Sequence, residues 1–260
     1  YVNAVIAYGT IMSSLENGLR ILSLLHEERT VLRVGEVCRE LDMPKASVSR
    51  LLKTLSEAGL LEREDRDQGY VVGGRALDLG ALYLARHSLL DLVRVAIDDL
   101  VREFGFTGHA GIVSGHERVL LVAQQGTYAL QHTGAVAERK PAFDSIIGRA
   151  ILARMDDERA MAQLDAQGKL GLRAMMSDQE VKAEFAAIRK SRIARSSSLI
   201  TPGISSIGAA IADPGRNEIM GLCLSFPTIA ADSGVQDQIA ARVAQHAHSI
   251  GMRMRDPVWS

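Results

Sequence analysis

Cysteine and long hydrophobic runs are almost missing from this sequence. The two cysteines, Cys38 and Cys223, lie far apart and are too few for a disulfide framework or a thiolate metal site, so a reducing cytoplasm fits best. No apolar run approaches the roughly 20 residues of a membrane helix, and we expect the chain to stay out of the membrane. Residues 1–12 are apolar but lack the basic lead-in of a signal peptide, and we interpret them as an N-terminal arm, either an extra helical turn or a packing arm.

An excess of charge of one sign is also missing. The formal net charge is -1, which excludes a globally basic surface, so any nucleic-acid contact must come from a local patch. At 260 residues and 47% hydrophobic content, the chain is long enough for a small domain plus one of average size. We therefore expect two domains.

Residues 13–74 carry the pattern of a small helical domain. Ser13 and Glu16 have the spacing of a capping box, and Leu15, Leu19, Leu22 and Leu25 predict a helix from about Leu15 to Leu25. A second short helix is indicated by an i, i+3, i+4, i+7 stripe: Val34, Val37, Cys38 and Leu41. Pro44 cannot continue that helix but suits the first position of a third one. The third helix repeats the same stripe with Val48, Leu51, Leu52 and Leu55.

The exposed face predicted for this third helix is cationic. No acid occurs between Lys45 and Ser56, whereas the neighbouring segments are rich in Glu and Asp. Taken alone, such a face is more often an ordinary solvated surface than a DNA contact. The context favours DNA, because two short strands around the polar turn RDQG follow Gly59. Three helices followed by a hairpin make a winged helix-turn-helix.

In a winged helix-turn-helix the third helix enters the major groove, and the wing reaches phosphate or the minor groove. Arg50 can offer a bidentate fork to guanine, while Ser47 and Ser49 can bond bases or phosphates. The other cations suit phosphate. The predicted DNA-binding residues are Arg33, Lys45, Ala46, Ser47, Ser49, Arg50, Lys53 and Arg66. An open alternative is that Arg63 and Arg66 only form surface ion pairs with the acids beside them.

Segments along the whole chain resemble one family. SLENGLRILSLL, VGEVCRELDMPKASVSRLLKTLSEAGLLER and GYVVGGRALDLGALYL are similar to the amino-terminal domain of IclR-type bacterial transcriptional regulators. KPAFDSIIGRAILA, TPGISSIGAAIAD and IMGLCLSFP resemble, in order, three segments of that family's effector domain. The resemblance implies a homodimer, often paired into tetramers. A dimer goes together with a palindromic operator of double-stranded DNA, because two-fold protein symmetry requires two-fold symmetry in the site.

The remaining sequence predicts a linker and a second domain. Residues 75–90 form an expected linker helix that is too apolar for a solvated linker and should pack against the same helix of a second subunit. Within 91–260, strands are expected at TGHAGIVSG, ERVLLVAQQG, LQHTGAV, GISSIGAAIAD and EIMGLCLSFP. Helices are expected at about 89–104, at DSIIGRAILARM, at SDQEVKAEFAAIRKSRIA with a Ser177–Glu180 capping box, and at about 235–254. The fold class is therefore α+β: a winged helix-turn-helix domain, a helical linker and a C-terminal GAF-like effector-binding domain with a mixed or antiparallel sheet flanked by helices.

A ligand pocket is expected in the second domain. Small residues leave room beside the sheet, and hydroxyls plus a helix start near Asp144 and Ser145 can hold a carboxylate, so an anionic small molecule is the expected guest. The resemblance implies an effector pocket lined by Phe143, Ser145, Gly148, Ser205, Ser206, Cys223 and Ser225. The alternative for any one of these glycines and serines is simple packing in a tight hairpin.

The chain departs from the family at two positions. Phe143 stands where relatives commonly carry His, and Thr201 where they commonly carry an acid. An aromatic wall and the loss of a repulsive charge would favour an aromatic or apolar carboxylate over a very polar acid. Arg149 and Arg195 are candidate counter-ions, although Arg149 sits where relatives carry a Lys that can be purely structural.

Catalysis is not expected, and neither is a cofactor or a metal. No stretch offers a nucleophile elbow, a phosphate loop or paired carboxylates, and His246 and His248 point in different directions on a helix. His109, Cys38 and Cys223 are interpreted as core or pocket-wall residues. The main hypothesis is a regulator whose operator affinity a small organic acid alters. Two alternatives stay open: a constitutive DNA-binding protein whose second domain only oligomerises, and a small-molecule enzyme with a DNA-binding appendage.

Overall fold

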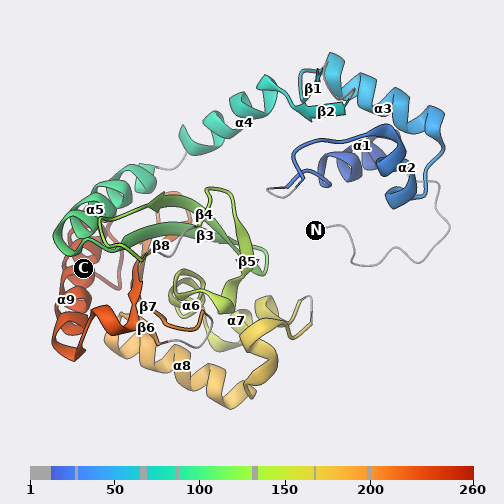
Figure 1. The fold of residues 1–260 in the computed structure, drawn as a ribbon. Helices are drawn as coiled ribbons and strands as arrows, with labels where there is room; N and C mark the ends of the chain where they lie inside the picture. Colours follow the sequence, from blue (N-terminus) through green and yellow to red (C-terminus); the bar gives the residue numbers. More distant parts are fainter. Residues whose placement is uncertain are drawn as a thin grey trace. The chain divides into compact units, whose positions relative to one another are not determined.

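The computed structural model describes residues 13–26, 29–64, 69–85, 88–130, 134–166, 168–197 and 201–260. The chain divides into two compact units, Tyr1–Arg86 and His87–Ser260, and each is described by itself (Figure 1). The expected N-terminal arm at 1–12 lies outside the described residues. None of the helices in the described ranges is long and apolar enough to cross a membrane.

The described residues of the first unit form three helices, a two-stranded sheet and a further helix. These are α1 (Ser14–Leu22), α2 (Val34–Leu41), α3 (Lys45–Glu57), β1 (Leu61–Glu64), β2 (Gly69–Val72) and α4 (Gly74–Ala85). The predicted stripes of α2 and α3 pack around one core, whose fully buried members are Ile21, Leu32, Val37, Val48, Leu52 and Leu61. The predicted winged helix-turn-helix is confirmed in this unit.

Helix α1 is shorter than predicted and turns only part of its apolar surface to the core. The capping box between Ser13 and Glu16 is present, but the helix ends at Leu22 and not near Leu25. It buries Gly18 and Ile21, whereas Leu15 and Leu19 are 72% and 56% exposed. This short helix carries apolar residues on two faces, and only one of them meets α2 and α3.

The turn between α2 and α3 is made by backbone geometry. Asp42 ends α2 in the left-handed region with φ 51°, and its amide donates to the carbonyl of Cys38. Pro44 is the residue before the first helical position and not that position itself, since α3 begins at Lys45. This turn holds α3 at a fixed angle to α2, as a helix-turn-helix requires.

The hairpin after α3 is tied back to the helices. β1 and β2 pair antiparallel from Leu61 opposite Val72 to Glu64 opposite Gly69. Leu32 and Tyr70 also exchange two backbone hydrogen bonds of 2.8 Å, and this antiparallel bridge pairs Leu32 with strand β2 of the hairpin. The wing is therefore anchored to the segment that enters α2. Its tip, residues 65–68 with the predicted phosphate contact Arg66, lies outside the described residues.

The second unit is built on a six-stranded sheet with the order β5-β4-β3-β8-β7-β6. Its strands are β3 (Thr107–Ser114), β4 (Glu117–Gln124), β5 (Arg139–Pro141), β6 (Ala194–Ser197), β7 (Ile204–Asp213) and β8 (Glu218–Pro227). Every pair of neighbours is antiparallel. Gly111 of β3 lies next to a bulge at Leu121 of β4, and a Cβ at Gly111 would meet the carbonyl oxygen of Val119 at 2.3 Å, so this close approach of the strands requires glycine.

Helices cover both faces of this sheet, which confirms the α+β class. α5 (Ser88–Phe104) and α9 (Ser233–Met254) pack together against one face, and α6 (Ile146–Leu152) packs against β7 and β8 from the other (Figure 1). α7 (Asp157–Asp165) and α8 (Asp178–Ser191) lie on the α6 side, and three short 3-10 helices connect elements: η1 (Ala142–Asp144), η2 (Gly171–Met175) and η3 (Thr228–Ala230). The Ser177–Glu180 capping box of α8 is present as predicted.

Three elements of the second unit differ from the prediction. The strand expected at LQHTGAV is wrong where it is described, because Leu130 and residues 134–136 are not in a strand. The edge strand is instead β5, whose sequence RKP is short and polar. β6 and α7 were not predicted, and the helix expected to reach Ala194 ends at Ser191. These segments are polar and half-exposed, so hydrophobic periodicity does not reveal them.

A buried ion pair closes the end of the second unit. Asp256 is fully buried and accepts two hydrogen bonds from Arg154, at 2.5 and 3.0 Å. The backbone amides of Ala212 and Val258 donate to the same carboxylate at 2.7 and 3.0 Å. Asp256 therefore joins the turn after α6, strand β7 and the C-terminal turn through four hydrogen bonds.

Asp256→Asn should destabilise this unit by about 3–5 kcal/mol, because it leaves Arg154 buried without its counter-charge. The chain has one tryptophan, Trp259, which is 3% exposed and lies beside this site, so its fluorescence during urea unfolding reports on this unit. Asp237→Asn is the matched control, since Asp237 is 73% exposed in its ion pair with Arg195 and should cost less than about 1 kcal/mol. Equal midpoints for the two variants would contradict the structural role given to Asp256.

Candidate functional site

The outer face of α3 presents four of the predicted DNA contacts to solvent. Lys45, Ala46, Arg50 and Lys53 are exposed. Ser47 and Ser49 are half-buried at the two edges of the same face, and Val48 and Leu52 are buried behind it. The helix therefore separates a packing face from an accessible cationic face, as a recognition helix needs.

The cations of this surface differ in how far they are neutralised. Lys53 pairs with Glu57 at 3.6 Å, and Arg33, at the start of α2, pairs with Glu36 at 3.6 Å. Lys45 and Arg50 take part in none of the ion pairs among the described residues. Their charge is the part of this surface most available to an anionic partner.

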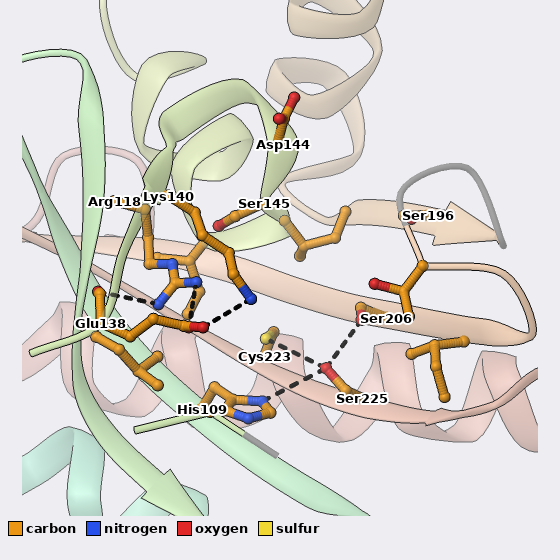
Figure 2. Close-up of a pocket in the computed structure, with 16 residues that line it drawn as sticks. His109, Arg118, Glu138, Lys140, Asp144, Ser145, Ser196, Ser206, Cys223 and Ser225 are labelled. Atoms are coloured by element: carbon orange, nitrogen blue, oxygen red, sulfur yellow. Dashed lines mark hydrogen bonds and ion pairs between the residues drawn. The ribbon is translucent and has the colours of Figure 1, made fainter. Parts of the chain in front are cut away.

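The second unit contains a cavity of about 80 Å³ between the sheet and the η1–α6 segment. Figure 2 shows side chains that enter it from β3, β4, β5, β7 and β8 and from the start of α6. The lining residues are His109, Arg118, Leu120, Gly134, Glu138, Lys140, Asp144, Ser145, Ile146, Ile147, Ser196, Thr201, Ile204, Ser206, Cys223 and Ser225. Most of these residues are polar, but apolar atoms, among them the aliphatic side chains from α6 and neighbouring strands, make up about half of the lining surface.

One side of the pocket is a chain of hydrogen-bonding groups on neighbouring strands. Ser206 and Ser225 are directly opposite each other in the β7–β8 register, and their hydroxyls are 2.9 Å apart. Ser225 Oγ is also 3.5 Å from His109 Nδ1 and 3.9 Å from Cys223 Sγ. Because these residues share one face of the sheet, their polar atoms converge on the cavity (Figure 2).

The other side of the pocket is a cluster of three charges, Arg118, Glu138 and Lys140. Arg118 Nη2 lies 2.9 Å from one carboxylate oxygen of Glu138, and Lys140 Nζ lies 2.7 Å from the other. Burial acts to raise the pKa of Glu138, but the hydrogen bonds from Lys140 and Arg118 outweigh it and leave the pKa below its ordinary value. Glu138 is therefore ionised at neutral pH, and the cluster carries one net positive charge.

Four of the seven predicted effector contacts line this pocket: Ser145, Ser206, Cys223 and Ser225. Thr201, noted as a departure from the family, lines it as well. The hydroxyl of Ser145 also caps α6 by accepting from the Gly148 amide at 3.1 Å. The expectation that the start of α6 holds a carboxylate through its amides is weakened, because this cap already uses one of them.

The other three predicted contacts are absent from the pocket lining. Phe143 is 1% exposed and packs edge-on against Phe185 with ring centres 5.8 Å apart, so it does not form the expected aromatic wall. Gly148 allows close packing, since a Cβ there would lie 1.9 Å from the carbonyl oxygen of Ala142. Ser205 alternates with Ser206 along β7, faces the other side of the sheet and bonds Thr228 at 2.9 Å.

The two counter-ions suggested by the sequence do not line the pocket either. Arg149 is buried and pairs with Glu184 at 3.1 Å, while Arg195 pairs with the exposed Asp237 at 2.9 Å. The cations that do line the pocket, Arg118 and Lys140, were missed. A signal for Arg118 existed, because it shares one face of its strand with Leu120 and so points toward the interior.

The titratable groups of the pocket favour binding over nucleophilic chemistry. Burial raises the pKa of the Cys223 thiol to about 11, with Ser225 and Arg118 offsetting part of the effect, so the thiol stays protonated at neutral pH. Burial also raises the pKa of Asp144, against the amide of Leu172 and the charge of Arg149. Within the described ranges, no group of three or more His, Cys, Asp and Glu residues is placed to hold a metal ion.

Curated proteins and solved structures resemble the chain over most of its length. The Transcriptional repressor IclR of Escherichia coli is 23% identical over 220 residues, covering 83% of this chain and 80% of that protein. The regulator BhcR of Paracoccus denitrificans is 25% identical over 245 residues, covering 93% of this chain and 87% of that protein. Among solved structures, the IclR protein of Thermotoga maritima has a TM-score of 0.71 at 19% identity and covers 93% of this chain and 98% of that one.

A further solved structure is an IclR homologue of Microbacterium hydrocarbonoxydans in complex with 4-hydroxybenzoate, with a TM-score of 0.78 at 17% identity, covering 94% of this chain and 99% of that one. These likenesses show a shared fold. Two family models match the chain: the IclR helix-turn-helix domain over residues 14–65, and the bacterial transcriptional regulator IclR C-terminal domain over residues 81–252. The chain therefore belongs to the IclR family of DNA-binding bacterial transcriptional regulators, with an N-terminal helix-turn-helix domain and a C-terminal effector-binding domain.

Proposed function

We propose that this regulator binds a palindromic operator as a homodimer, or as a pair of dimers, and that a small organic acid in the pocket of the second unit alters its operator affinity. The observation that carries this proposal is the pocket of the second unit, where a cationic cluster faces a row of hydroxyls. Such a pocket suits an anion that also accepts or donates hydrogen bonds. A regulator of DNA acts where the chromosome lies, so the proposed compartment is the cytoplasm.

The proposed DNA contacts are the exposed face of α3 and the phosphate contacts around it. Arg50 stands at the centre of that face with no ion pair among the described residues, which leaves its guanidinium available for a guanine edge. Lys45, Lys53 and Arg33 are assigned to phosphate, together with Arg66. Ser47, Ser49 and Ala46 allow the backbone of α3 to come close to the bases.

Arg50→Ala should weaken binding to the DNA upstream of the protein's own gene by about 1–3 kcal/mol and relax base specificity. Lys45→Ala should weaken binding to all DNA sequences alike. It should also lower by about one the number of counter-ions released on binding, as read from the slope of log affinity against log salt concentration. Fluorescence anisotropy on labelled duplexes at several salt concentrations measures both effects. Lys182→Ala, an exposed lysine on α8, is the control and should leave binding unchanged. Wild-type affinity in Arg50→Ala would refute the assignment of α3 as the recognition helix.

The proposed dimer rests on α4. Leu77, Leu79 and Leu82 are 76%, 52% and 65% exposed within one chain, and they do not share one face of the helix. Leaving so much apolar surface in water is unfavourable at about 25 cal/mol per Å². A helix that is apolar on several sides needs a cover, and the same helix of a second subunit supplies one of matching character.

Leu77→Glu should shift the protein toward monomers and, through the loss of the second half-site contact, weaken operator binding. Sedimentation velocity over a range of protein concentrations measures the self-association. Leu170→Glu is the control, because Leu170 is 50% exposed but lies in the second unit near η2. An unchanged association constant in Leu77→Glu would count against α4 as the dimer contact.

The proposed effector is a small carboxylate, and the volume of the cavity indicates how large it can be. The relative from Microbacterium hydrocarbonoxydans was solved with 4-hydroxybenzoate, which makes an aromatic acid one candidate. The cavity here is about 80 Å³, whereas an engineered cavity that admits benzene measures roughly 150 Å³. Compact acids therefore fit this cavity without any opening, and we expect them to bind more tightly than aromatic ones.

Ser206→Ala should weaken acid binding by about 0.5–1.5 kcal/mol, because a pocket hydroxyl is lost. Calorimetric titration with lactate, succinate and 4-hydroxybenzoate measures the effect. Ser205→Ala is the matched control, since the neighbouring hydroxyl faces away and bonds Thr228. Equal losses in both variants would mean that the effect is structural and that the pocket is not the binding site.

The same titrations separate the proposal from its two rivals. An acid that binds one arrangement of the dimer better than another must change operator affinity, and the change is reciprocal. If a bound acid leaves operator affinity unchanged, the second unit only oligomerises. If the acid is consumed on incubation, the protein is an enzyme, and the proposal that it binds without turnover fails.

A further inference from the structure

The charged cluster in the pocket is asymmetric in its burial. The side chains of Arg118 and Glu138 are 7% and 19% exposed, whereas that of Lys140 is 43% exposed. Arg118 also donates to the backbone carbonyl of Glu138 at 3.4 Å, so it is bound to that residue twice. Lys140 holds Glu138 through one contact, that of its ammonium group, and Figure 2 shows this group pointing into the pocket.

This asymmetry decides which cation can change partner. Breaking a buried ion pair is costly when it leaves an uncompensated charge behind. If Lys140 left Glu138, the carboxylate would keep Arg118, and its charge would stay compensated. If Arg118 left, a buried guanidinium would lose both of its contacts to that residue. Lys140 is therefore the cation that can move at low cost.

We propose that Lys140 is the specificity-determining residue that takes the carboxylate of the effector, and that Glu138 is an internal competitor that occupies Lys140 until the effector arrives. This inference rests on the proposed function, because it assumes that an acid enters this pocket. Binding then exchanges one charge-assisted contact of Lys140 for another, while Arg118 holds Glu138 in place as a positioning residue.

The charges of the pocket also define the class of effector. The cluster has one net positive charge, which a single carboxylate neutralises. A second carboxylate would meet Glu138, which lines the cavity. The opposite wall offers the hydroxyls of Ser206 and Ser225, which bond a hydroxyl or keto oxygen. The effector class is therefore a compact monocarboxylic acid that carries a hydroxyl or keto group.

A purely structural role of the cluster and the proposed competition predict opposite effects of neutralising Glu138 on effector binding. The strands that bear these residues are already joined by backbone pairing, from Glu117 opposite Pro141 to Val119 opposite Arg139. If the cluster only stabilised this edge, neutralising Glu138 would loosen the pocket and weaken binding. If Glu138 competes for Lys140, neutralising Glu138 strengthens binding, because the acid no longer has to displace it.

The test is calorimetric titration of the full-length protein with lactate, and with lactamide as the uncharged analogue. Wild type should bind lactate and not lactamide. Lys140→Met should weaken lactate binding at least about tenfold, as expected for the loss of a charged hydrogen bond, and Lys140→Arg should restore most of it. Glu138→Gln should tighten binding by about threefold or more. Lys169→Met is the matched control, because Lys169 is 50% exposed in an ion pair with Asp178 away from the pocket.

The outcomes separate this inference from the proposed function. If wild type binds none of lactate, succinate and 4-hydroxybenzoate, the proposed function fails. If wild type binds lactate but Lys140→Met binds it equally well, or Glu138→Gln binds it no better than wild type, the role of these two residues is refuted. Tighter binding of succinate than of lactate refutes the monocarboxylate class. Thermal unfolding followed through Trp259 confirms that each variant is folded before titration.

Discussion

The antiparallel pairing of β3 with β8 joins the beginning of the second unit to its end, and the pocket depends on its register. Thr107 lies opposite Ser225, and His109 lies opposite Cys223, although more than a hundred residues separate them along the chain. A slip of one residue would turn each side chain of β8 to the other face of the sheet. Ser225 would then face α5 and α9 instead of the cavity. One long-range contact therefore sets both the order of the sheet and the chemistry of its inner face.

Features that depend on local chemistry could be predicted from the sequence. The acid-free face of α3, the capping boxes at Ser13 and Ser177 and the long apolar strands β7 and β8 all appear as expected, because each signal lies within a few residues. The buried face of α1 could not be predicted in the same way. Leu15 and Leu19 have the spacing of a core stripe, and only the packing of α2 and α3 decides that Ile21 is buried in their place. Helical periodicity finds a helix, but it does not choose between two apolar faces.

The pocket residues also fall into some that could be predicted from the sequence and some that could not. Its hydroxyls lie in segments that resemble the family, so Ser206 and Ser225 could be assigned from that resemblance. Its charges could not, because Arg118 and Glu138 are 20 residues apart and meet only through the short polar strand β5. Phe143 shows the reverse error. Its aromatic ring suggested a pocket wall, but η1 turns it into the core against Phe185. Strand alternation assigns a face only where the strand itself can be recognised.

Two ion pairs in this unit show how burial distinguishes structure from function. Asp256 is completely buried and receives four hydrogen bonds, so it has no capacity left for another partner. Lys140 is nearly half-exposed and holds one carboxylate that Arg118 already neutralises. Well-packed apolar residues stabilise an interior at least as well as ionic groups do, so a charge that stability does not require needs another reason to be there. For Lys140 that reason is the reversible binding of a ligand. The surroundings of Lys140 fit a ligand carboxylate that enters the pocket.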